Sequence, residues 1–410
     1  MSLCRILFGL TLGLVPLSAA AQNKPIWSWH EADAQILDPR FSVKGDELVI
    51  TRRIVDLDGG QAALTSEATH KRRSANALKN ARYAGPEVMI LKIGAKTGAG
   101  IDWGWSPAFS PDGQHIVYVH PISGERDQYT QIGIRVFNRS NKSTITLAKA
   151  IDENELRDPV FTPDGQHVAY ALRNVKDSAT VFWRAAKDGT TNAILHAPGK
   201  SWINFSRYLT GRLVVMTSTP VGNLPGADKA GNANHQLQEL WDVGPPIRRV
   251  HSWGQVPHDD SPASWGANRY GRDPSLESRF GSNKAGDVLV YDRGWRTAGT
   301  MAGGAGAKQD YSGPGTRKDA GLLSEDGRLV ARIFPKDTTD KSPQGIEIRN
   351  AMTQQLLKTL NISGKIQNIV WSADSRLLAV VASKHGGQTR YGRSDNLIFL
   401  HDELLVFRIS

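Results

Sequence analysis

The sequence predicts an all-β chain built from a repeated four-stranded antiparallel sheet, and three observations support this class. First, one short motif recurs along most of the 410 residues. Second, each copy places a turn, usually one that contains glycine, between two apolar stretches, which is typical of two strands joined by a tight turn. Third, segments of alternating apolar and polar residues follow most copies, as expected of additional strands.

The two clearest copies of the motif, Ser106–Val119 and Asp158–Ala171, are nearly identical. Weaker copies keep an apolar anchor before the turn and an apolar strand after it. We expect each anchor to pack inward and Asp-Gly to form the turn, because glycine accepts a positive φ and aspartate bonds to nearby backbone. The seven anchors are Phe41, Phe109, Phe161, Phe205, Phe280, Leu323 and Trp371.

The strand after the turn, for example Ile116–Val119 or Leu377–Val381, is apolar on both faces, as in a strand buried between stacked sheets. Four short strands recurring about every 40 to 50 residues predict the blades of a β-propeller. The seven copies predict seven blades, with six or eight as alternatives because the middle copies are degenerate. Outer strand pairs are expected at 131–137 with 144–147, 181–185 with 193–195, and 396–400 with 404–409. Either 404–409 or an N-terminal strand near 26–29 would close the ring, and the sequence leaves both open.

Phe-Ser-Pro-Asp-Gly followed by an apolar strand resembles the TolB-like, WD40-like β-propeller repeat of exported bacterial proteins. The resemblance covers nearly all of residues 38–410 and implies a propeller fold. It does not extend to TolB itself, which has an α/β domain before its propeller, so a role in the Tol envelope system is not implied. Such propellers also precede peptidase domains of the prolyl oligopeptidase type, but the chain has no Gly-x-Ser-x-Gly elbow and we do not expect that activity.

The N-terminus is typical of a secretory signal peptide at 1–21. Arg5 precedes an apolar stretch at 6–17, and Ala19 and Ala21 form an A-x-A cleavage signal before Gln22. The alternative is an N-terminal membrane anchor. Cleavage would leave a lead-in at 22–37 and the propeller at 38–410, with no transmembrane segment and a periplasmic or secreted location. The single cysteine, Cys4, lies in the leader, so the mature chain excludes cysteine catalysis, thiolate metal sites and disulfides.

An excess of basic residues points to an anionic partner. The chain has 50 Lys+Arg against 40 Asp+Glu, a net charge of +10, while its 40% hydrophobic content excludes a disordered protein. An insertion at about 65–87 contains the basic residues Lys71, Arg72, Arg73, Lys79 and Arg82. They form either an ordinary solvated segment or a patch for an envelope protein or an anionic glycan or lipid surface. Nucleic acid is not an expected partner, because no matching module is present.

A second insertion at about 220–315 is rich in tryptophan and glycine. Aromatic rings beside polar groups are typical of carbohydrate and small-ligand sites, although tryptophans on long loops also serve as packing anchors. His258, Asp259 and Asp260 could ligate a metal, act as acid and base, or form a surface turn, and no second ligand pair accompanies them. We interpret His115 and His167 as strand-start residues, and Asp112, Asp164, Asp326 and Asp374 as turn residues. The candidate ligand-binding residues are Trp253, His258, Asp259, Trp265, Arg269 and Trp295.

These features favour an exported, monomeric propeller that binds or scaffolds an envelope protein or an anionic or glycan ligand. The alternative is an enzyme at the propeller face, such as a glycan lyase, hydrolase or lactonase with or without a divalent cation. Carboxylate or histidine side chains from three or more blades meeting at the axis would favour the enzyme. The sequence contains no pattern that identifies catalytic residues, a metal site or a cofactor.

Overall fold

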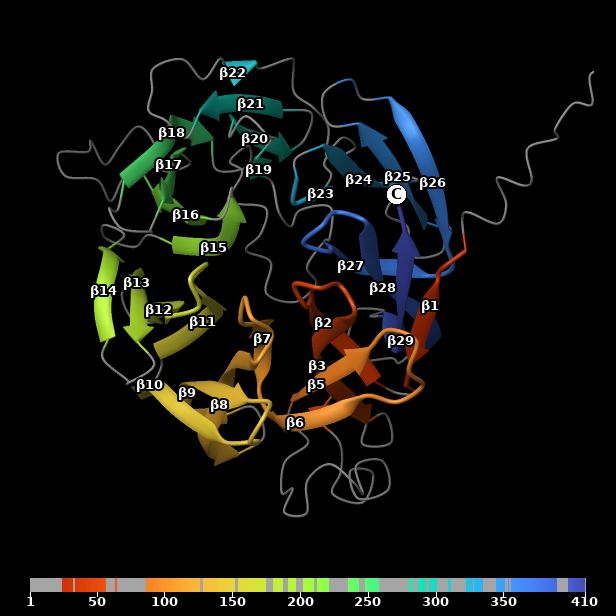
Figure 1. Cartoon of the computed structure of the whole chain (residues 1–410), viewed down its shortest axis with the longest axis horizontal. Helices are drawn as coiled ribbons and strands as arrows, with labels where there is room; N and C mark the ends of the chain where they lie inside the picture. Colours follow the sequence, from red (N-terminus) through yellow and green to blue (C-terminus); the bar gives the residue numbers. More distant parts are fainter. Residues whose placement is uncertain are drawn as a thin grey trace, which may run out of the picture.

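The strands form seven sheets arranged around a central axis (Figure 1). In this computed structural model the described residues are 24–31, 34–56, 63–64, 86–125, 128–151, 154–174, 180–186, 191–196, 202–209, 212–220, 235–242, 248–257, 280–282, 287–292, 295–300, 309–310, 322–326, 328–334, 344–350, 353, 355–388 and 397–409. Each sheet is antiparallel, and within each the strands are ordered from the axis outward. The expected all-β fold with four-stranded blades is therefore confirmed, and the described sheets number seven.

The blades follow one another along the chain. Blade 1 contains β2 (Ala34–Phe41), β3 (Glu47–Asp56), β5 (Glu87–Lys92) and β6 (Ala99–Trp103), with β4 (Ala63–Leu64) paired to β3. Blade 2 contains β7 (Trp105–Phe109), β8 (His115–Glu125), β9 (Gln128–Asn138) and β10 (Thr144–Ile151). Blade 3 contains β11 (Asn154–Phe161), β12 (His167–Asn174), β13 (Thr180–Ala186) and β14 (Thr191–His196).

The remaining blades have the same order. Blade 4 contains β15 (Trp202–Leu209), β16 (Arg212–Pro220), β17 (His235–Asp242) and β18 (Arg248–Pro257). Blade 5 contains β19 (Phe280–Ser282), β20 (Asp287–Asp292), β21 (Trp295–Thr300) and β22 (Gln309–Asp310). Blade 6 contains β23 (Leu322–Leu323), β24 (Leu329–Phe334), β25 (Gln344–Asn350) and β26 (Leu356–Ile362). Blade 7 contains β27 (Lys365–Trp371), β28 (Leu377–Gln388), β29 (Leu397–Arg408) and β1 (Trp27–His30).

Each sequence repeat forms the inner hairpin of one blade. In the clear copies the anchor ends the innermost strand and lies opposite the second residue of the next strand, as Phe109 does with Ile116. Blade 4 differs: its strands continue to Leu209 and Arg212, so Tyr208 takes the anchor position and Phe205 lies opposite Met216. Sequence similarity placed the anchor three residues early here because the turn is shorter than in the other copies.

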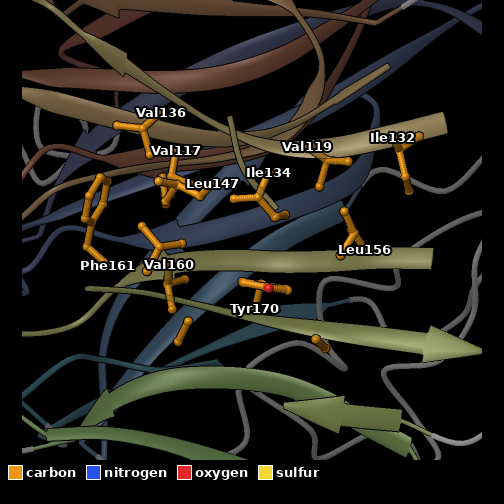
Figure 2. Packing of buried hydrophobic residues seen from close by; sticks show 14 of the residues in the cluster. Val117, Val119, Ile132, Ile134, Val136, Leu147, Leu156, Val160, Phe161 and Tyr170 are labelled. Atoms are coloured by element: carbon orange, nitrogen blue, oxygen red, sulfur yellow. The ribbon is translucent and has the colours of Figure 1, made fainter. Parts of the chain in front are cut away.

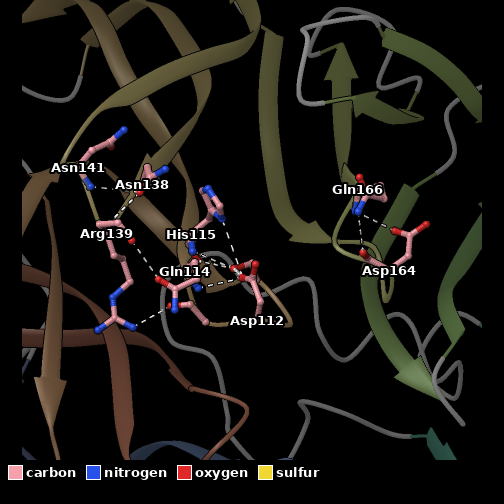
Figure 3. Close-up of polar contacts among 11 residues, drawn as sticks. Asp112, Gln114, His115, Asn138, Arg139, Asn141, Asp164 and Gln166 are labelled. Atoms are coloured by element: carbon pink, nitrogen blue, oxygen red, sulfur yellow. Dashed lines mark hydrogen bonds and ion pairs between the residues drawn. The ribbon is translucent and has the colours of Figure 1, made fainter.

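The turn of each clear copy satisfies its own polar groups (Figure 3). Ser110 Oγ donates to Asp112 Oδ1 at 2.5 Å, and the same carboxylate oxygen accepts the Gln114 amide at 2.9 Å. Ser110 Oγ also accepts the His115 amide at 2.9 Å, and Gly113 adopts φ 71°. These bonds confirm Asp112 as a turn residue, and His115 begins β8 as expected. The pairs Thr162–Asp164, Ser324–Asp326 and Ser372–Asp374 repeat the arrangement.

The cores lie between blades rather than inside them. Ile116, Val117, Tyr118 and Val119 are all fully buried, because β8 presents one face to blade 1 and the other to blade 3. Figure 2 shows apolar side chains of blade 2 facing Leu156, Val160, Phe161 and Tyr170 of blade 3. The expectation that the strand after each turn is apolar on both faces is confirmed here and in β28.

The N-terminal strand completes the last blade. β1 pairs antiparallel with β29, and Figure 1 shows the first strand beside the last. The expected pair 396–400 and 404–409 is wrong, because Leu397–Arg408 form one continuous strand, β29, along β28. The fourth strand of blade 7 is therefore β1, with Trp29 opposite Leu404. Of the two alternatives for closing the ring, the structure has the N-terminal strand at the outer edge.

The two expected insertions differ in how much of each is described. The first begins after β3 and β4 and ends where β5 starts at Glu87. The basic residues Lys71, Arg72, Arg73, Lys79 and Arg82 lie outside the described residues. The second insertion, 220–315, is in part regular blade, because β17, β18, β19, β20, β21 and β22 fall within it. Apolar and polar residues alternate only weakly in these strands, so their sequence resembles that of a loop.

Candidate functional site

The two ends of the ring are built differently. Strand direction alternates within each blade, so all the turns between first and second strands lie at one end, here called the turn end. The connections between second and third strands, and those between blades, lie at the opposite end, here called the loop end. The strand ends that border 57–86, 221–234 and 258–279 are all at the loop end. The strand ends that border these three long segments therefore share one end of the ring.

Two of the six candidate ligand-binding residues lie on described strands, one in blade 4 and one in blade 5. Trp253 lies on β18 at a register shift between Gly254 and Ser252, and Trp295 is the first residue of β21. The side chains of these two tryptophans are outside the described part of the structure. His258, Asp259, Trp265 and Arg269 also lie outside the described residues. Their role stays a prediction.

Three neighbouring blades have the longest hairpins pointing toward the loop end. β28 and β29 of blade 7 have 12 residues each, and β8 and β9 of blade 2 have 11 each. Between them, β3 of blade 1 has 10 residues and pairs at its end with β4. The corresponding strands of blade 3 have 8 and 7 residues. Buried and half-buried polar groups link blades 7, 1 and 2 to one another below these hairpins.

The largest such group joins blades 1 and 2 and is here called the seam cluster: Asp102, Tyr118, His120 and Arg135. Asp102 Oδ2 accepts hydrogen bonds from Tyr118 Oη at 2.6 Å and from an Arg135 terminal nitrogen at 2.7 Å. His120 Nδ1 lies 2.9 Å from the Trp103 carbonyl oxygen and 3.5 Å from Asp102 Oδ2. Outer strand β6 of blade 1 therefore contributes the acceptors, and β8 and β9 of blade 2 contribute the donors.

Burial shifts the titration of two members of the seam cluster. Tyr118 is fully buried, and desolvation followed by the charge of Asp102 raises the pKa of its phenol. Desolvation lowers the pKa of His120, and the nearby Asp102 only partly opposes it. His120 is therefore neutral at pH 7, with 12% of its side chain exposed. The cluster thus presents a neutral imidazole backed by a half-buried carboxylate.

A second group lies within blade 1, beside the start of β5. Arg52 donates to both oxygens of Glu31 at 2.8 Å and to Glu87 Oε2. Desolvation raises the pKa of Glu87, and the charge of Arg52 opposes that shift. Arg52 and Glu87 are 7% and 4% exposed, so removing either one would leave a buried charge without its partner. We assign this group a structural role.

A third link joins blade 7 to blade 1. The buried Asp402 accepts the Ile36 amide at 2.8 Å through Oδ2 and the Ser383 hydroxyl through Oδ1. Ile36 lies on β2, the first strand of blade 1, whereas Asp402 lies on β29, the third strand of blade 7. This carboxylate therefore supplements β1 in closing the ring.

Sequence patterns do not single out the seam cluster. Its two most distant members, Asp102 and Arg135, are 33 residues apart and belong to different repeats. One signal was present: His120 follows the fully apolar stretch Ile116–Val119 directly. Within the described ranges, no group of three or more His, Cys, Asp or Glu side chains is placed to hold a metal ion. The described part of the chain also has no helix of the length and hydropathy needed to cross a bilayer.

The comparisons with solved structures support the class of fold. The β-propeller domain of the Trilobed protease from Pyrococcus furiosus, described as having an open velcro topology, has a TM-score of 0.53 at 10% identity, covering 86% of this chain and 90% of that one. The β-propeller domain of Cps50 (Swd1) from Myceliophteria thermophila has a TM-score of 0.51 at 11% identity, covering 93% and 99%.

A third similar structure is Pyrococcus horikoshii acylaminoacyl peptidase, with a TM-score of 0.50 at 12% identity over 86% of this chain and 50% of that chain. No family model and no curated protein matches the sequence. At these identities the likeness shows the fold, and the chain is a β-propeller.

Proposed function

We propose that this chain is an exported propeller that binds or scaffolds an envelope protein or an anionic or glycan ligand through the loop end. The TolB-like repeat and the signal-peptide pattern at 1–21 support export. The observation that carries the proposal is the asymmetry of the ring. Among the described residues, the clear copies have short, self-bonded turns at one end, and the strand ends bordering 57–86, 221–234 and 258–279 are at the other. Function in propellers resides in such segments, because blade strands are used for packing.

Charge favours an anionic surface on the partner. The segment 57–86 contains the five basic residues of the basic patch against two acidic ones, Asp58 and Glu67, so its net charge is +3. Attraction between exposed charges falls as salt rises, because the Debye length shortens from about 10 Å at 0.1 M to about 3 Å at 1 M. Binding through this segment should therefore weaken at high salt.

The test is a pull-down from a native envelope fraction with tagged protein starting at Gln22, washed at low and high salt. One variant replaces Lys71, Arg72, Arg73, Lys79 and Arg82 with glutamine. A matched control makes the same charge change at the turn end, where Lys44, Lys92, Lys96, Lys142 and Arg376 are exposed. We expect the first variant to lose a salt-sensitive partner and the control to keep it. Equal losses in both variants, or no specific partner with the unaltered chain, would contradict the proposal.

A further inference from the structure

The exposed aliphatic side chains of the described residues gather at the turn end. Six large hydrophobic side chains in the described ranges are exposed, and five of them belong to this end, with exposed fractions from 46% to 54%. The sixth, Leu37, lies within β2. Ile26 precedes β1, Val43 lies in the turn between β2 and β3, Ile145 follows the turn between β9 and β10, and Leu356 and Leu357 begin β26. Single exposed aliphatics are ordinary, but five at one end of the ring form a surface.

Contacts between blades 6 and 7 bring three of these residues to one strand end. Lys358 Nζ donates to the Arg408 carbonyl oxygen at 2.7 Å, which joins the start of β26 to the end of β29. The Ile26 amide donates to the Val406 carbonyl oxygen at 2.8 Å, two residues before Arg408. Since residues 356–357 directly precede Lys358, they and Ile26 border the same end of β29.

Blade 1 continues this surface and blade 2 extends it. Trp27 Nε1 donates to the Ala95 carbonyl oxygen at 2.9 Å, so β1 is tied to the turn between β5 and β6 of blade 1. At the next boundary, Arg139 of blade 2 donates to Glu47 of blade 1 at 2.9 Å. The exposed aliphatics of blades 6, 7, 1 and 2 therefore lie along one continuous arc of the ring.

The same arc is basic. The cations that it exposes among the described residues are Lys24, Lys44, Lys92, Lys96, Lys142, Arg328, Arg376 and Arg408. Its exposed carboxylates in those ranges are Asp46, Asp112 and Asp374, and each already accepts a hydrogen bond from a serine of its own turn. Arg328 and Arg376 keep 61% and 72% of their side chains exposed despite the aspartates beside them. The five aliphatic residues and these eight cations are here called the turn-end arc.

Aliphatic and cationic side chains intermixed in this way suit a lipid surface better than a protein. A stable protein interface needs a contiguous apolar core from which charged residues are depleted. A bilayer instead accepts aliphatic side chains one by one at its boundary, while anionic headgroups attract the surrounding Lys and Arg. A soluble anionic ligand would leave the aliphatic side chains in water.

The position of the expected leader gives an independent reason. β1 starts at the turn end, and eight residues, 18–25, separate Ile26 from the apolar stretch at 6–17. An extended chain spans about 3.5 Å per residue, so these residues reach at most about 28 Å. A leader inserted in a membrane before cleavage therefore keeps the turn end next to that membrane.

We propose that the turn-end arc docks the propeller on the surface of an anionic bilayer, with its cations on the headgroups and its aliphatic side chains at the acyl boundary. This surface is separate from the basic patch and goes beyond partner binding through the loop end. Docking by the turn end directs the loop end away from the membrane, because the two ends of the ring face opposite ways.

The first test is co-sedimentation with vesicles of protein starting at Gln22, which excludes insertion of the leader itself. We expect binding to phosphatidylcholine vesicles that contain phosphatidylglycerol, weaker binding at high salt, and little binding to phosphatidylcholine alone. The variant with Lys44, Lys92, Lys96, Lys142 and Arg376 replaced by glutamine should bind about tenfold more weakly or worse, because each cation near an anionic surface contributes to binding.

The matched control for this variant is the glutamine variant of the five basic-patch residues, which should bind the vesicles normally. Equal binding of the unaltered chain to both kinds of vesicle would overturn the proposal. A loss confined to the basic-patch variant would also overturn it, because lipid binding would then belong to that patch.

A second test reports insertion directly and uses the lack of cysteine after Gln22. Val43→Cys and Leu357→Cys each carry an environment-sensitive fluorophore, and Ser123→Cys, exposed on β8 toward the loop end, is the matched control. With anionic vesicles the labels at 43 and 357 should brighten and shift to the blue, and the label at 123 should not change. Unchanged emission at 43 and 357, or an equal change at 123, would refute docking by the turn end.

This proposal and the proposed function can fail separately. Capture of a partner in the pull-down depends on the basic patch, whereas vesicle binding depends on the turn-end arc. If the unaltered chain ignores vesicles but the turn-end variant loses a protein in the pull-down, the arc binds an acidic protein and the bilayer is refuted.

Discussion

Replacing Trp29 with alanine should destabilise the ring at the point where it closes. Trp29 is 6% exposed and belongs to the same apolar cluster as Leu404 and Val406 of β29 and Ile36 of blade 1. A buried tryptophan removes about 200 Å² of surface from water, and at about 25 cal/mol per Å² this is worth about 5 kcal/mol. Measured Trp→Ala substitutions in cores cost about 3–5 kcal/mol. We therefore expect Trp29→Ala to lower the free energy of unfolding by about 3–5 kcal/mol.

Urea unfolding followed by circular dichroism measures this change. The matched control is Ser28→Ala, one residue earlier on the same strand and exposed, which should change stability by less than about 0.5 kcal/mol. Hydrogen exchange supplies the location: amides of β29 and β2 should exchange faster in Trp29→Ala, while those of β12 in blade 3 should not. If Trp29→Ala and Ser28→Ala have equal effects, or if exchange rises evenly over all blades, β1 does not close the ring in the way described.

Three further predictions concern the turns and one connection between blades. Ser375, at φ 60°, takes the left-handed position that glycine has in other turns, and its buried Oγ accepts the Asp326 amide of blade 6 at 3.0 Å. In urea unfolding, Ser375→Ala should therefore cost about 1–3 kcal/mol, and Ser375→Gly less, because glycine recovers about 1 kcal/mol of backbone strain; equal losses would contradict this. Desolvation raises the pKa of Asp326, but hydrogen bonds from Ser324 and Arg328 outweigh it and hold the pKa below 3.8, so the carboxylate stabilises the fold above that pH. Asp326→Asn should accordingly be less stable than the unaltered chain at pH 7, with the difference shrinking as the pH falls below 3.8, and a constant difference would refute the assignment. Gly104→Ala should cost about 3 kcal/mol or more by thermal unfolding, because its Cβ would collide with the backbone of β8, whereas Gly94→Ala, with φ 92° and no atom within 4 Å of the added Cβ, should cost about 1–2 kcal/mol.

The fold could be predicted because it depends on a pattern that each repeat carries locally. An anchor such as Phe109, the Asp112–Gly113 turn and the apolar stretch at 116–119 together specify a buried hairpin without reference to distant residues. Where local chemistry departs from the pattern, prediction was less accurate. In blade 4 the turn is shorter, so Tyr208 rather than Phe205 is the anchor. In blade 7 the strands expected at 396–400 and 404–409 are one long strand, β29.

The sequence by itself determined the all-β class, the four-stranded repeat and the chemistry of the turns, because each depends on residues within about one repeat of one another. The tertiary structure decided how the ring closes, which segments share one end, and that Asp102, Tyr118, His120 and Arg135 meet at a seam. These outcomes depend on the alternating direction of the strands and on contacts such as that of Ile36 with Asp402, which are 366 residues apart. The candidate site arises between two repeats, and no pattern within either repeat could reveal it.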